Sequence, residues 1–174
     1  MPIDGCRRSF DELARVVLPA HMAQMRERMQ SPIPMADFAV KGVGPATLRD
    51  KLGFDHDPSG CYVLIDQHKP IYVGISKHVI TRLMEHVRGT DYMTATLVYR
   101  IAATRHPHGK TAAEAMRDAD FRSRFRETRD YLLGLHVALV EIDNPLELYL
   151  FEPYCALELD TGFEAGGWNT FETH

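Results

Sequence analysis

One stretch, from Gly60 to Gly89, constrains the fold more than any other part of the chain. Two short β-rich segments, residues 61–66 and 71–75, flank a polar segment that contains a proline, which predicts two strands joined by a turn. Residues 79–87 then place apolar side chains three and four apart, which predicts a helix. Ser76 is its expected N-cap and Gly89 its end. The stretch therefore predicts a strand–turn–strand–helix unit.

Four polar side chains accompany this unit. Tyr62 and Tyr72 lie in the two predicted strands, and Arg82 and His86 are four residues apart, which places them on one helix face. Two phenols, a guanidinium and an imidazole on so compact a unit suit the binding and hydrolysis of a phosphodiester. Taken singly, each has a simpler explanation, because tyrosines in strands are commonly packing residues and charged residues on helices commonly face solvent.

The stretch resembles the GIY-YIG nucleases. Gly60-Cys61-Tyr62 matches the first motif with cysteine in place of isoleucine, and Tyr72-Val73-Gly74 matches the second with valine in place of isoleucine. Ten residues separate Tyr62 from Tyr72, and ten separate Tyr72 from Arg82, as in that family. One such tripeptide alone carries no information, whereas both at this spacing, followed by the arginine and histidine, form a specific signal.

The resemblance implies a mixed α/β fold of the α+β type, with a small, mainly antiparallel three-stranded sheet flanked by helices. Residues 136–142 form a short β-branched run and predict the third strand. We expect an N-terminal helical arm over residues 1–55 and the nuclease domain over residues 56–174. A helical insertion is expected at about residues 91–134.

The N-terminal arm carries its own helix signals. Residues 8–30 follow a helical pattern that opens with a capping box and contains Pro19, so a kink just before that proline is expected. A glycine turn at residues 42–44 precedes Pro45, which favours an ordinary helix start. The alternative is the phosphate-binding turn of a helix-hairpin-helix, because glycines allow close backbone approach to an anion.

The resemblance asks for two more residues after the third strand, a metal-binding glutamate and an asparagine. Glu152 follows an apolar run on a predicted helix, and Asn169 lies in a Trp-Asn pair near the end of the chain. Glu147 and Glu158 on the same helix remain alternatives, although Glu158 lies more than half a turn round from Glu152. Pro153 beside Glu152 departs from the family pattern.

The implied metal is a single Mg²⁺, for which Mn²⁺ would substitute. Two-metal nucleases need several clustered acids, and the sequence offers one acid at the required place, Glu152. Arg82 would pair with the phosphate, because its planar fork matches phosphate oxygens. Mg²⁺ and Arg82 together would stabilise the charge of the transition state.

The remaining members of the implied site handle protons and orientation. Tyr62 would assist deprotonation of the attacking water, and His86 would orient it or accept a proton at neutral pH. A phenol with a pKa near 10 can do this only where its surroundings lower that pKa. Tyr72 and Asn169 would hydrogen-bond the phosphate or the base.

Double-stranded DNA is the expected partner. Ser76, Lys77 and Arg88 flank the predicted helix of the motif, and Arg122 and Arg126 line one side of a helix in the insertion, so these five are the expected DNA contacts. That insertion helix also carries acidic residues, and a solvated face is the alternative. The net charge of −4 does not indicate a nucleic-acid binder, but a local basic patch suffices because phosphate contacts act locally.

Two further groups contain metal-binding residue types. Residues 55–57 read Asp-His-Asp, but the following Pro-Ser-Gly marks a loop, which favours a solvated segment over a metal cluster. His106 and His108 flank a proline two residues apart, a spacing that argues against joint metal binding.

The tail from Trp168 to His174 and the Arg82–His86 spacing resemble restriction-type members of the family. Such enzymes are often homodimers, because a palindromic site asks for two-fold symmetry. Two other classes stay open. One is a non-catalytic DNA-binding or interaction module on the same scaffold; the other is a small-molecule enzyme, which would need a deep pocket.

A cytoplasmic location is expected from three features. No apolar run approaches the roughly 20 residues of a membrane span. The N-terminus carries charges where a signal peptide would be apolar. The three cysteines, Cys6, Cys61 and Cys155, form no CxxC motif and no even set, which indicates reduced thiols.

Overall fold

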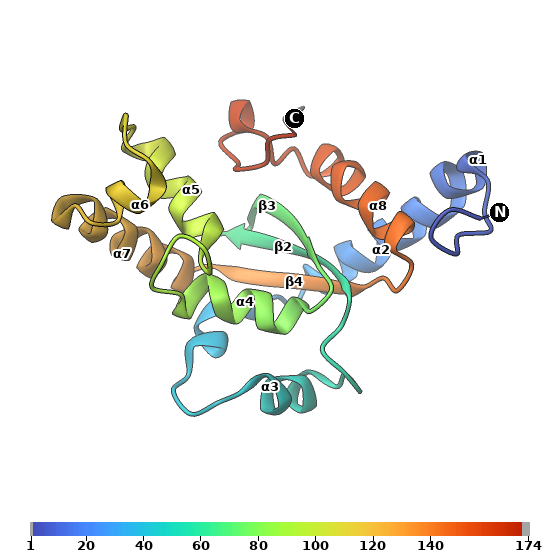
Figure 1. Ribbon diagram of the computed structural model, residues 1–174. Helices are drawn as coiled ribbons and strands as arrows, with labels where there is room; N and C mark the ends of the chain where they lie inside the picture. The colour runs from blue at the N-terminus through green and yellow to red at the C-terminus, as the bar shows by residue number, and fades with distance from the viewer. Residues whose placement is uncertain (1, 172–174) are drawn as a thin grey trace.

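The computed structural model describes residues 2–171 and shows an α+β protein built on one open antiparallel sheet (Figure 1). The tail compared with restriction-type members ends at residues 172–174, which lie outside the described residues. The sheet has four strands in the order β1-β4-β2-β3. They are β1 (Ile33–Pro34), β2 (Gly60–Asp66), β3 (Lys69–Ser76) and β4 (His136–Glu141).

The expectation of three strands therefore needs correction. The sequence pattern predicts β2, β3 and β4, and the structure confirms all three. It does not predict β1, because two residues beside prolines form no β-rich run. Pro34 is tolerated there because β1 lies at the edge of the sheet and pairs only with β4.

The β2–β3 hairpin brings the two motif tyrosines to one face of the sheet. Tyr62 pairs with Gly74, and Leu64 pairs with Tyr72. Paired residues in an antiparallel ladder share a face, so both rings point the same way. The turn at residues 67–68 has two positive φ values, 47° and 82°, as the two-residue hairpin turn that matches strand twist requires.

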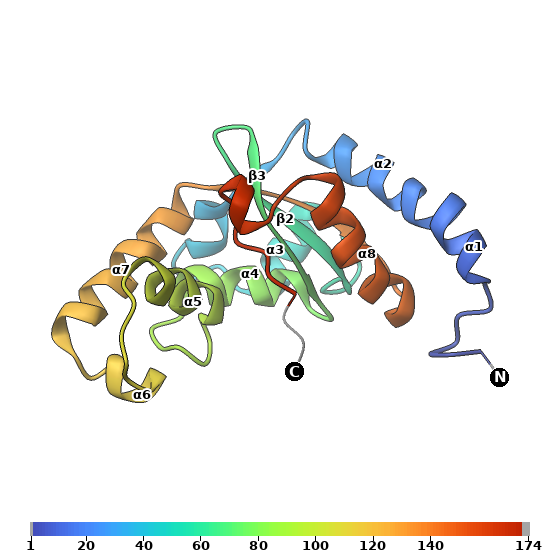
Figure 2. The ribbon, with the colours of Figure 1, turned by 90° about the horizontal axis from the view of Figure 1, so that it is seen from above.

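Helices cover both faces of the sheet, as seen from above in Figure 2. The face of Tyr62 and Leu64 packs in one cluster with α4, α5, α7 and the 3₁₀ segment η2. The opposite face, with Cys61 and Val63, packs against α2 and α8. The main helices are α2 (Leu18–Arg28), η2 (Met35–Ala39), α4 (Val79–Arg88), α5 (Thr96–Arg105), α7 (Ala119–Leu133) and α8 (Pro145–Glu158). This alternation is what a period of two along each strand produces.

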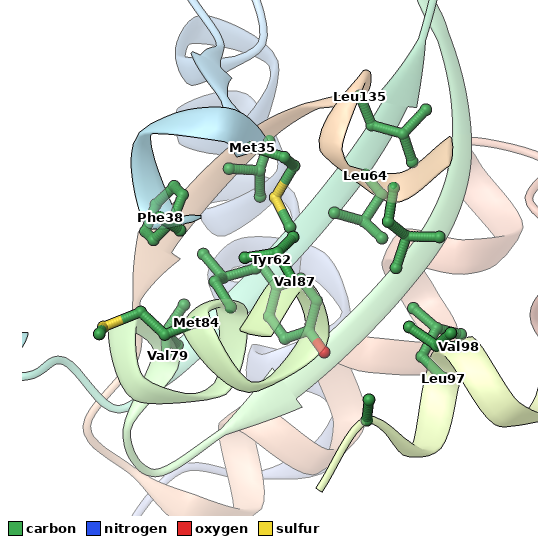
Figure 3. Packing of buried hydrophobic residues seen from close by; sticks show 14 of the residues in the cluster. Met35, Phe38, Tyr62, Leu64, Val79, Met84, Val87, Leu97, Val98 and Leu135 are labelled. Carbon is green, nitrogen blue, oxygen red and sulfur yellow. The ribbon is translucent and has the colours of Figure 1, made fainter. Parts of the chain in front are cut away.

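The N-terminal segment shares its core with the rest of the chain. Met35 and Phe38 of η2 are fully buried and belong to the same cluster as Tyr62, Leu64 and Val79 (Figure 3). In that view the Tyr62 hydroxyl lies at the end of the ring away from Met35 and Phe38. Residues 1–55 thus supply part of the hydrophobic core that surrounds Tyr62, one of the predicted catalytic residues.

The N-terminal helix contains a wide turn where a kink is expected. The helix begins with α1 (Phe10–Glu12), passes through the π-helical turn η1 (Leu13–Val17) and continues as α2. Pro19 lacks a backbone N–H and its ring crowds the carbonyl four residues earlier, so a widened turn beside it relieves both problems. Ser9 accepts a hydrogen bond from the backbone of Glu12, as the capping pattern predicts.

The other helix predictions hold with shifted boundaries. α3 (Pro45–Leu52) starts at the expected proline, and α8 starts at Pro145 after an Asn144 cap. The expected helical insertion contains three helices: α5, α6 (Ala112–Ala115) and α7. The break between α6 and α7 arises because the Asp118 side chain accepts two backbone N–H bonds and opens a new helix. A short 3₁₀ segment, η3 (Phe163–Ala165), follows α8.

Two further observations concern the apolarity of the helices and the three cysteines. Within residues 2–171, no helix combines the length and the apolarity that crossing a membrane requires. Cys6, Cys61 and Cys155 are buried and form no disulfide with one another.

Candidate active site

A buried tyrosine–histidine pair lies at the centre of the candidate site. The hydroxyl oxygen of Tyr62 on β2 and Nε2 of His86 on α4 are 2.8 Å apart. Tyr62 is 1% exposed and His86 is 0% exposed. His86 is buried because α4 packs its apolar face, with Leu83 and Val87, onto the sheet. Two residues that the motif spacing predicts to be close are thus in direct contact.

The surroundings hold both members of this pair in their neutral forms. Burial, together with the charges of Arg82 and Arg100, lowers the pKa of His86 from 6.5 to about 3. Burial and nearby Tyr72 raise the pKa of Tyr62 well above its ordinary value, although Arg82 opposes this shift. His86 Nδ1 is buried and has no hydrogen-bond partner among the described residues. The resting pair is therefore a neutral phenol against a neutral imidazole.

A side chain larger than that of glycine would not fit at the glycine of either motif. A Cβ at Gly60 would lie 2.1 Å from the carbonyl oxygen of Val140, so only glycine allows β2 and β4 to approach there. A Cβ at Gly74 would lie 2.6 Å from both Cζ and the hydroxyl oxygen of Tyr62. The second glycine thus makes room for the Tyr62 ring, which explains why the two motifs occur together.

Arg82 lies at the boundary between α4 and α5. Its Nη1 donates to Glu85 Oε2 at 2.9 Å and to the Thr94 carbonyl at 3.1 Å, and Nη2 donates to Thr96 Oγ1. Its side chain is 26% exposed, whereas His86 one turn later is inside. The predicted helix face therefore has a buried end and an accessible end, which suits an anion arriving from solvent.

Arg100 on α5 is a site residue that the sequence interpretation missed. Its guanidinium carbon lies 5.4 Å from the centre of the Tyr72 ring, and Nη2 donates to the Trp168 carbonyl at 2.7 Å. Its charge lowers the pKa of Tyr72 and of Glu152, and burial raises both. Arg100 Nε is buried without a hydrogen-bond partner among the described residues. The available signal was a lone arginine in the apolar run TLVYRIAA.

The structure separates the three glutamates of α8. Glu147 pairs with Arg8 at 3.2 Å and His21 at 3.3 Å, and Glu158 pairs with Arg26 at 2.8 Å, so both are engaged with the N-terminal helix. Glu152 makes no recorded hydrogen bond or ion pair within residues 2–171. Burial raises its pKa, and the charge of Arg100 opposes that rise. Of the three, Glu152 is the one whose charge acts on the pKa of Tyr72 and whose own pKa is lowered by Arg100.

Asn169 is tied to the edge of the sheet. Its Oδ1 accepts from the Val73 backbone N–H at 2.7 Å and from Thr161 Oγ1 at 2.8 Å, and its Nδ2 donates to the Val73 carbonyl at 2.8 Å. The side chain amide therefore pairs with both outward-facing backbone groups of β3, as a neighbouring strand would. This geometry gives Asn169 a role in attaching the C-terminal loop, and its contact with phosphate or base stays a prediction.

Replacement of Asn169 by alanine is expected to lower the free energy of unfolding by about 2–3 kcal/mol, because buried backbone groups of Val73 lose their partners. Urea denaturation measures this loss, and Thr170→Ala in the same loop is the control. An Asn169→Ala protein of wild-type stability without cleavage activity would instead place the amide in the reaction.

The expected DNA contacts differ in availability. Arg88 donates to the carbonyls of Phe38, Val40 and Val43 at 2.7–3.0 Å, so its guanidinium holds the N-terminal segment to α4 and is withdrawn here from the DNA contacts. Lys77 is exposed. Ser76 is half-buried, and Arg122 and Arg126 are exposed on α7. The DNA contacts of Lys77 and of these three residues stay predictions.

Ser76 does not cap α4 as the sequence predicts. Its Oγ accepts from the backbone N–H of His78 at 3.0 Å, before the helix begins. Asp57, from the loop before β2, supplies the cap instead. Its carboxylate accepts from the backbone N–H groups of Ile80 at 2.8 Å and Thr81 at 3.0 Å, where the positive end of the helix dipole favours an anion.

Two places offer metal ligands. Among the described residues, one group of three brings its ligand atoms within 4.8 Å of one another: His56, Glu141 and Asp143, all exposed. His56 thus lies in a solvated loop, as predicted, but next to the end of β4. Glu152 stands apart from that group, so it fits only an ion that takes its remaining ligands from water and phosphate, which is how Mg²⁺ is usually held.

Comparison with protein-family models, with curated proteins and with solved structures found no match for this chain. The likeness to the GIY-YIG nucleases thus rests on the motif residues and their spacing in the sequence.

Proposed function

We propose that this protein is a metal-dependent endonuclease of the GIY-YIG type that hydrolyses phosphodiester bonds of double-stranded DNA, as restriction-type members do. One observation carries the proposal: the hydroxyl of Tyr62 contacts His86 in the core, and neighbouring Tyr72 lies under the Arg100 guanidinium, with the charges of Arg82 and Glu152 acting on its pKa. Hydrolysis of a phosphodiester needs a group that accepts a proton from water and positive charge that stabilises the phosphate. The Tyr62–His86 pair could supply the first, and the two arginines with a metal on Glu152 could supply the second.

The two arginines would bind the scissile phosphate. Arg82 is partly exposed, and the Arg100 guanidinium lies over Tyr72 with one buried N–H that lacks a partner. Planar guanidinium groups donate pairs of hydrogen bonds to phosphate oxygens and stabilise the charge that builds up on them during attack. Cations on two different helices can hold the phosphate from two sides.

Tyr62 and His86 would carry the proton away from the attacking water. The phenol oxygen takes the proton of the water as the phenol passes its own proton to Nε2 of His86, so no free phenolate is needed. The resting pKa of His86, about 3, makes it a weak acceptor. A bound phosphate anion offsets the charges of Arg82 and Arg100, which are part of the cause of that low value, and so makes His86 a better acceptor once substrate is present.

Glu152 would hold the metal ion. It is partly buried, close to Arg100, and free of the ion pairs that engage Glu147 and Glu158. A bound Mg²⁺ supplies Lewis-acid stabilisation of phosphate charge and of the leaving oxygen. Arg100 helps to keep the carboxylate ionised in spite of its burial, so that it remains able to bind a cation.

Arg100→Met is expected to slow cleavage by about 10- to 100-fold, because the variant loses one charge-assisted hydrogen bond to the phosphate. Single-turnover cleavage measures it. Arg100→Lys should recover part of the rate because it keeps the charge. Arg105→Met is the matched control: Arg105 is on the same helix and stacks on Tyr131 and Trp168. Wild-type cleavage by Arg100→Met would remove this arginine from the site.

The proposed function is tested by incubating plasmid DNA with the protein in Mg²⁺, in Mn²⁺ or in EDTA. Discrete fragments that require the metal support a restriction-type endonuclease, and a smear supports a nuclease without sequence preference. Shifted DNA on a gel without any cleavage would favour the non-catalytic binding module instead. Neither binding nor cleavage of DNA would overturn the proposal.

A further inference from the structure

A pocket of about 340 Å³ lies between the end of β3 and the start of α8. Ile75, Pro145 and Leu148 give it an apolar lining, and Lys77, Asp143 and Tyr149 contribute polar groups. Tyr149 is 66% exposed, so its ring is available at the mouth of the pocket. A small apolar cavity with a few polar groups at its edge is the usual form of a ligand site.

The pocket and Glu152, the proposed metal ligand, share helix α8. Tyr149 precedes Glu152 by three residues, so the two side chains lie on neighbouring positions of one helix side. Their separation along the helix axis is about 4.5 Å, so the two side chains can contact neighbouring parts of one nucleotide strand. A nucleotide next to a phosphate held near Glu152 would therefore reach the pocket.

The chemistry of the pocket suits a flat aromatic ring with a polar edge. Tyr149 offers a face on which a base can stack, and the apolar lining offers a second surface. The Asp143 carboxylate can accept a hydrogen bond from an exocyclic amino group, and exposed Lys77 can pair with the adjoining phosphate. The hydroxyl groups of Ser59 and Ser76, also in the lining, are engaged with backbone groups of Ile142 and His78.

We propose that this pocket receives one unstacked nucleobase of the DNA substrate, next to the phosphate that is cleaved. A base within an intact duplex cannot enter such a pocket, so the protein must bind DNA with an unpaired base more tightly than fully paired DNA. The inference rests on the proposed nuclease function, because the base in the pocket would belong to the DNA that the nuclease binds.

The test measures binding of short DNA duplexes by fluorescence anisotropy in EDTA, where a metal-dependent enzyme does not cleave. One duplex is fully paired and the other contains a single unpaired base. We expect wild type to prefer the second, and Tyr149→Ala to weaken that binding by about 10-fold or more, the loss of one base–aromatic stack. Binding of the paired duplex should change by less than about twofold.

Two variants serve as controls. Tyr149→Phe keeps the ring and should bind both duplexes as wild type does. Leu157→Ala removes another exposed side chain of α8, 81% exposed and outside the pocket lining, and should also bind as wild type. Asp143 is a less selective probe, because it also neighbours His56 and Glu141.

The outcomes separate the inference from the function on which it rests. If wild type binds DNA but shows no preference for the unpaired base, or if Tyr149→Ala binds both duplexes normally, the pocket is no base site and the proposed nuclease function stands. If wild type neither binds nor cleaves any DNA, the proposed function fails and the inference fails with it.

Discussion

Glu152→Gln is expected to reduce metal-dependent cleavage of DNA by at least about a thousandfold, because removal of the carboxylate charge removes the proposed metal ligand, worth several kcal/mol of transition-state stabilisation. Glutamine has nearly the same shape, and Glu152 makes no recorded hydrogen bond or ion pair within residues 2–171, so folding should be unaffected. Cleavage is measured on plasmid DNA at saturating Mg²⁺, and folding by urea denaturation.

Glu158→Gln is the matched control, since Glu158 lies on the same helix but pairs with Arg26. It should cleave DNA at the wild-type rate. Full activity of Glu152→Gln, together with loss of activity in Glu158→Gln or Glu147→Gln, would mean that Glu158 or Glu147 binds the metal in place of Glu152. Full activity of all three would remove the carboxylates of this helix from the reaction.

His86 is expected to make the wild-type protein less stable in acid. Its pKa is 6.5 when unfolded and about 3 when folded, so between these values the unfolded state binds a proton that the folded state does not. Above pH 6.5 His86 is neutral in both states and does not lower the free energy of unfolding. As pH falls from 6.5 toward 3, protonation of His86 in the unfolded state lowers that free energy progressively. The loss is about 2 kcal/mol between pH 7 and pH 5, at about 1.4 kcal/mol per unit below 6.5.

Urea denaturation at pH 7, 6 and 5 measures this dependence. His86→Gln cannot titrate but can accept a hydrogen bond from Tyr62, so its unfolding free energy should fall by about 2 kcal/mol less than that of wild type over this range. The comparison uses the change with pH in each protein, so a constant cost of the substitution cancels. His106→Gln, at an exposed histidine, should follow wild type. Equal pH dependence in His86→Gln and wild type would mean that His86 is not held neutral by the fold.

Local sequence patterns were sufficient for the elements that form the scaffold. The hairpin and the third strand follow from β-rich runs and a polar turn, which act between residues close in the chain. The motif spacing also placed Tyr62 and His86 together, because a short hairpin followed directly by a helix leaves few arrangements. Two-residue β1 and the break between α6 and α7 were not predictable from such patterns.

The sequence by itself thus determined the hairpin-plus-helix unit, the three main strands and the order of the candidate residues, since these depend on neighbours in the chain. Only the tertiary structure decided which polar groups remain available. It engages Arg88 and Asn169 with distant backbone groups, lets Asp57 cap α4 in place of Ser76, and brings Arg100 to Tyr72 and Glu152. The physical reason is that burial and hydrogen-bond pairing depend on residues far apart in sequence, which no local pattern records.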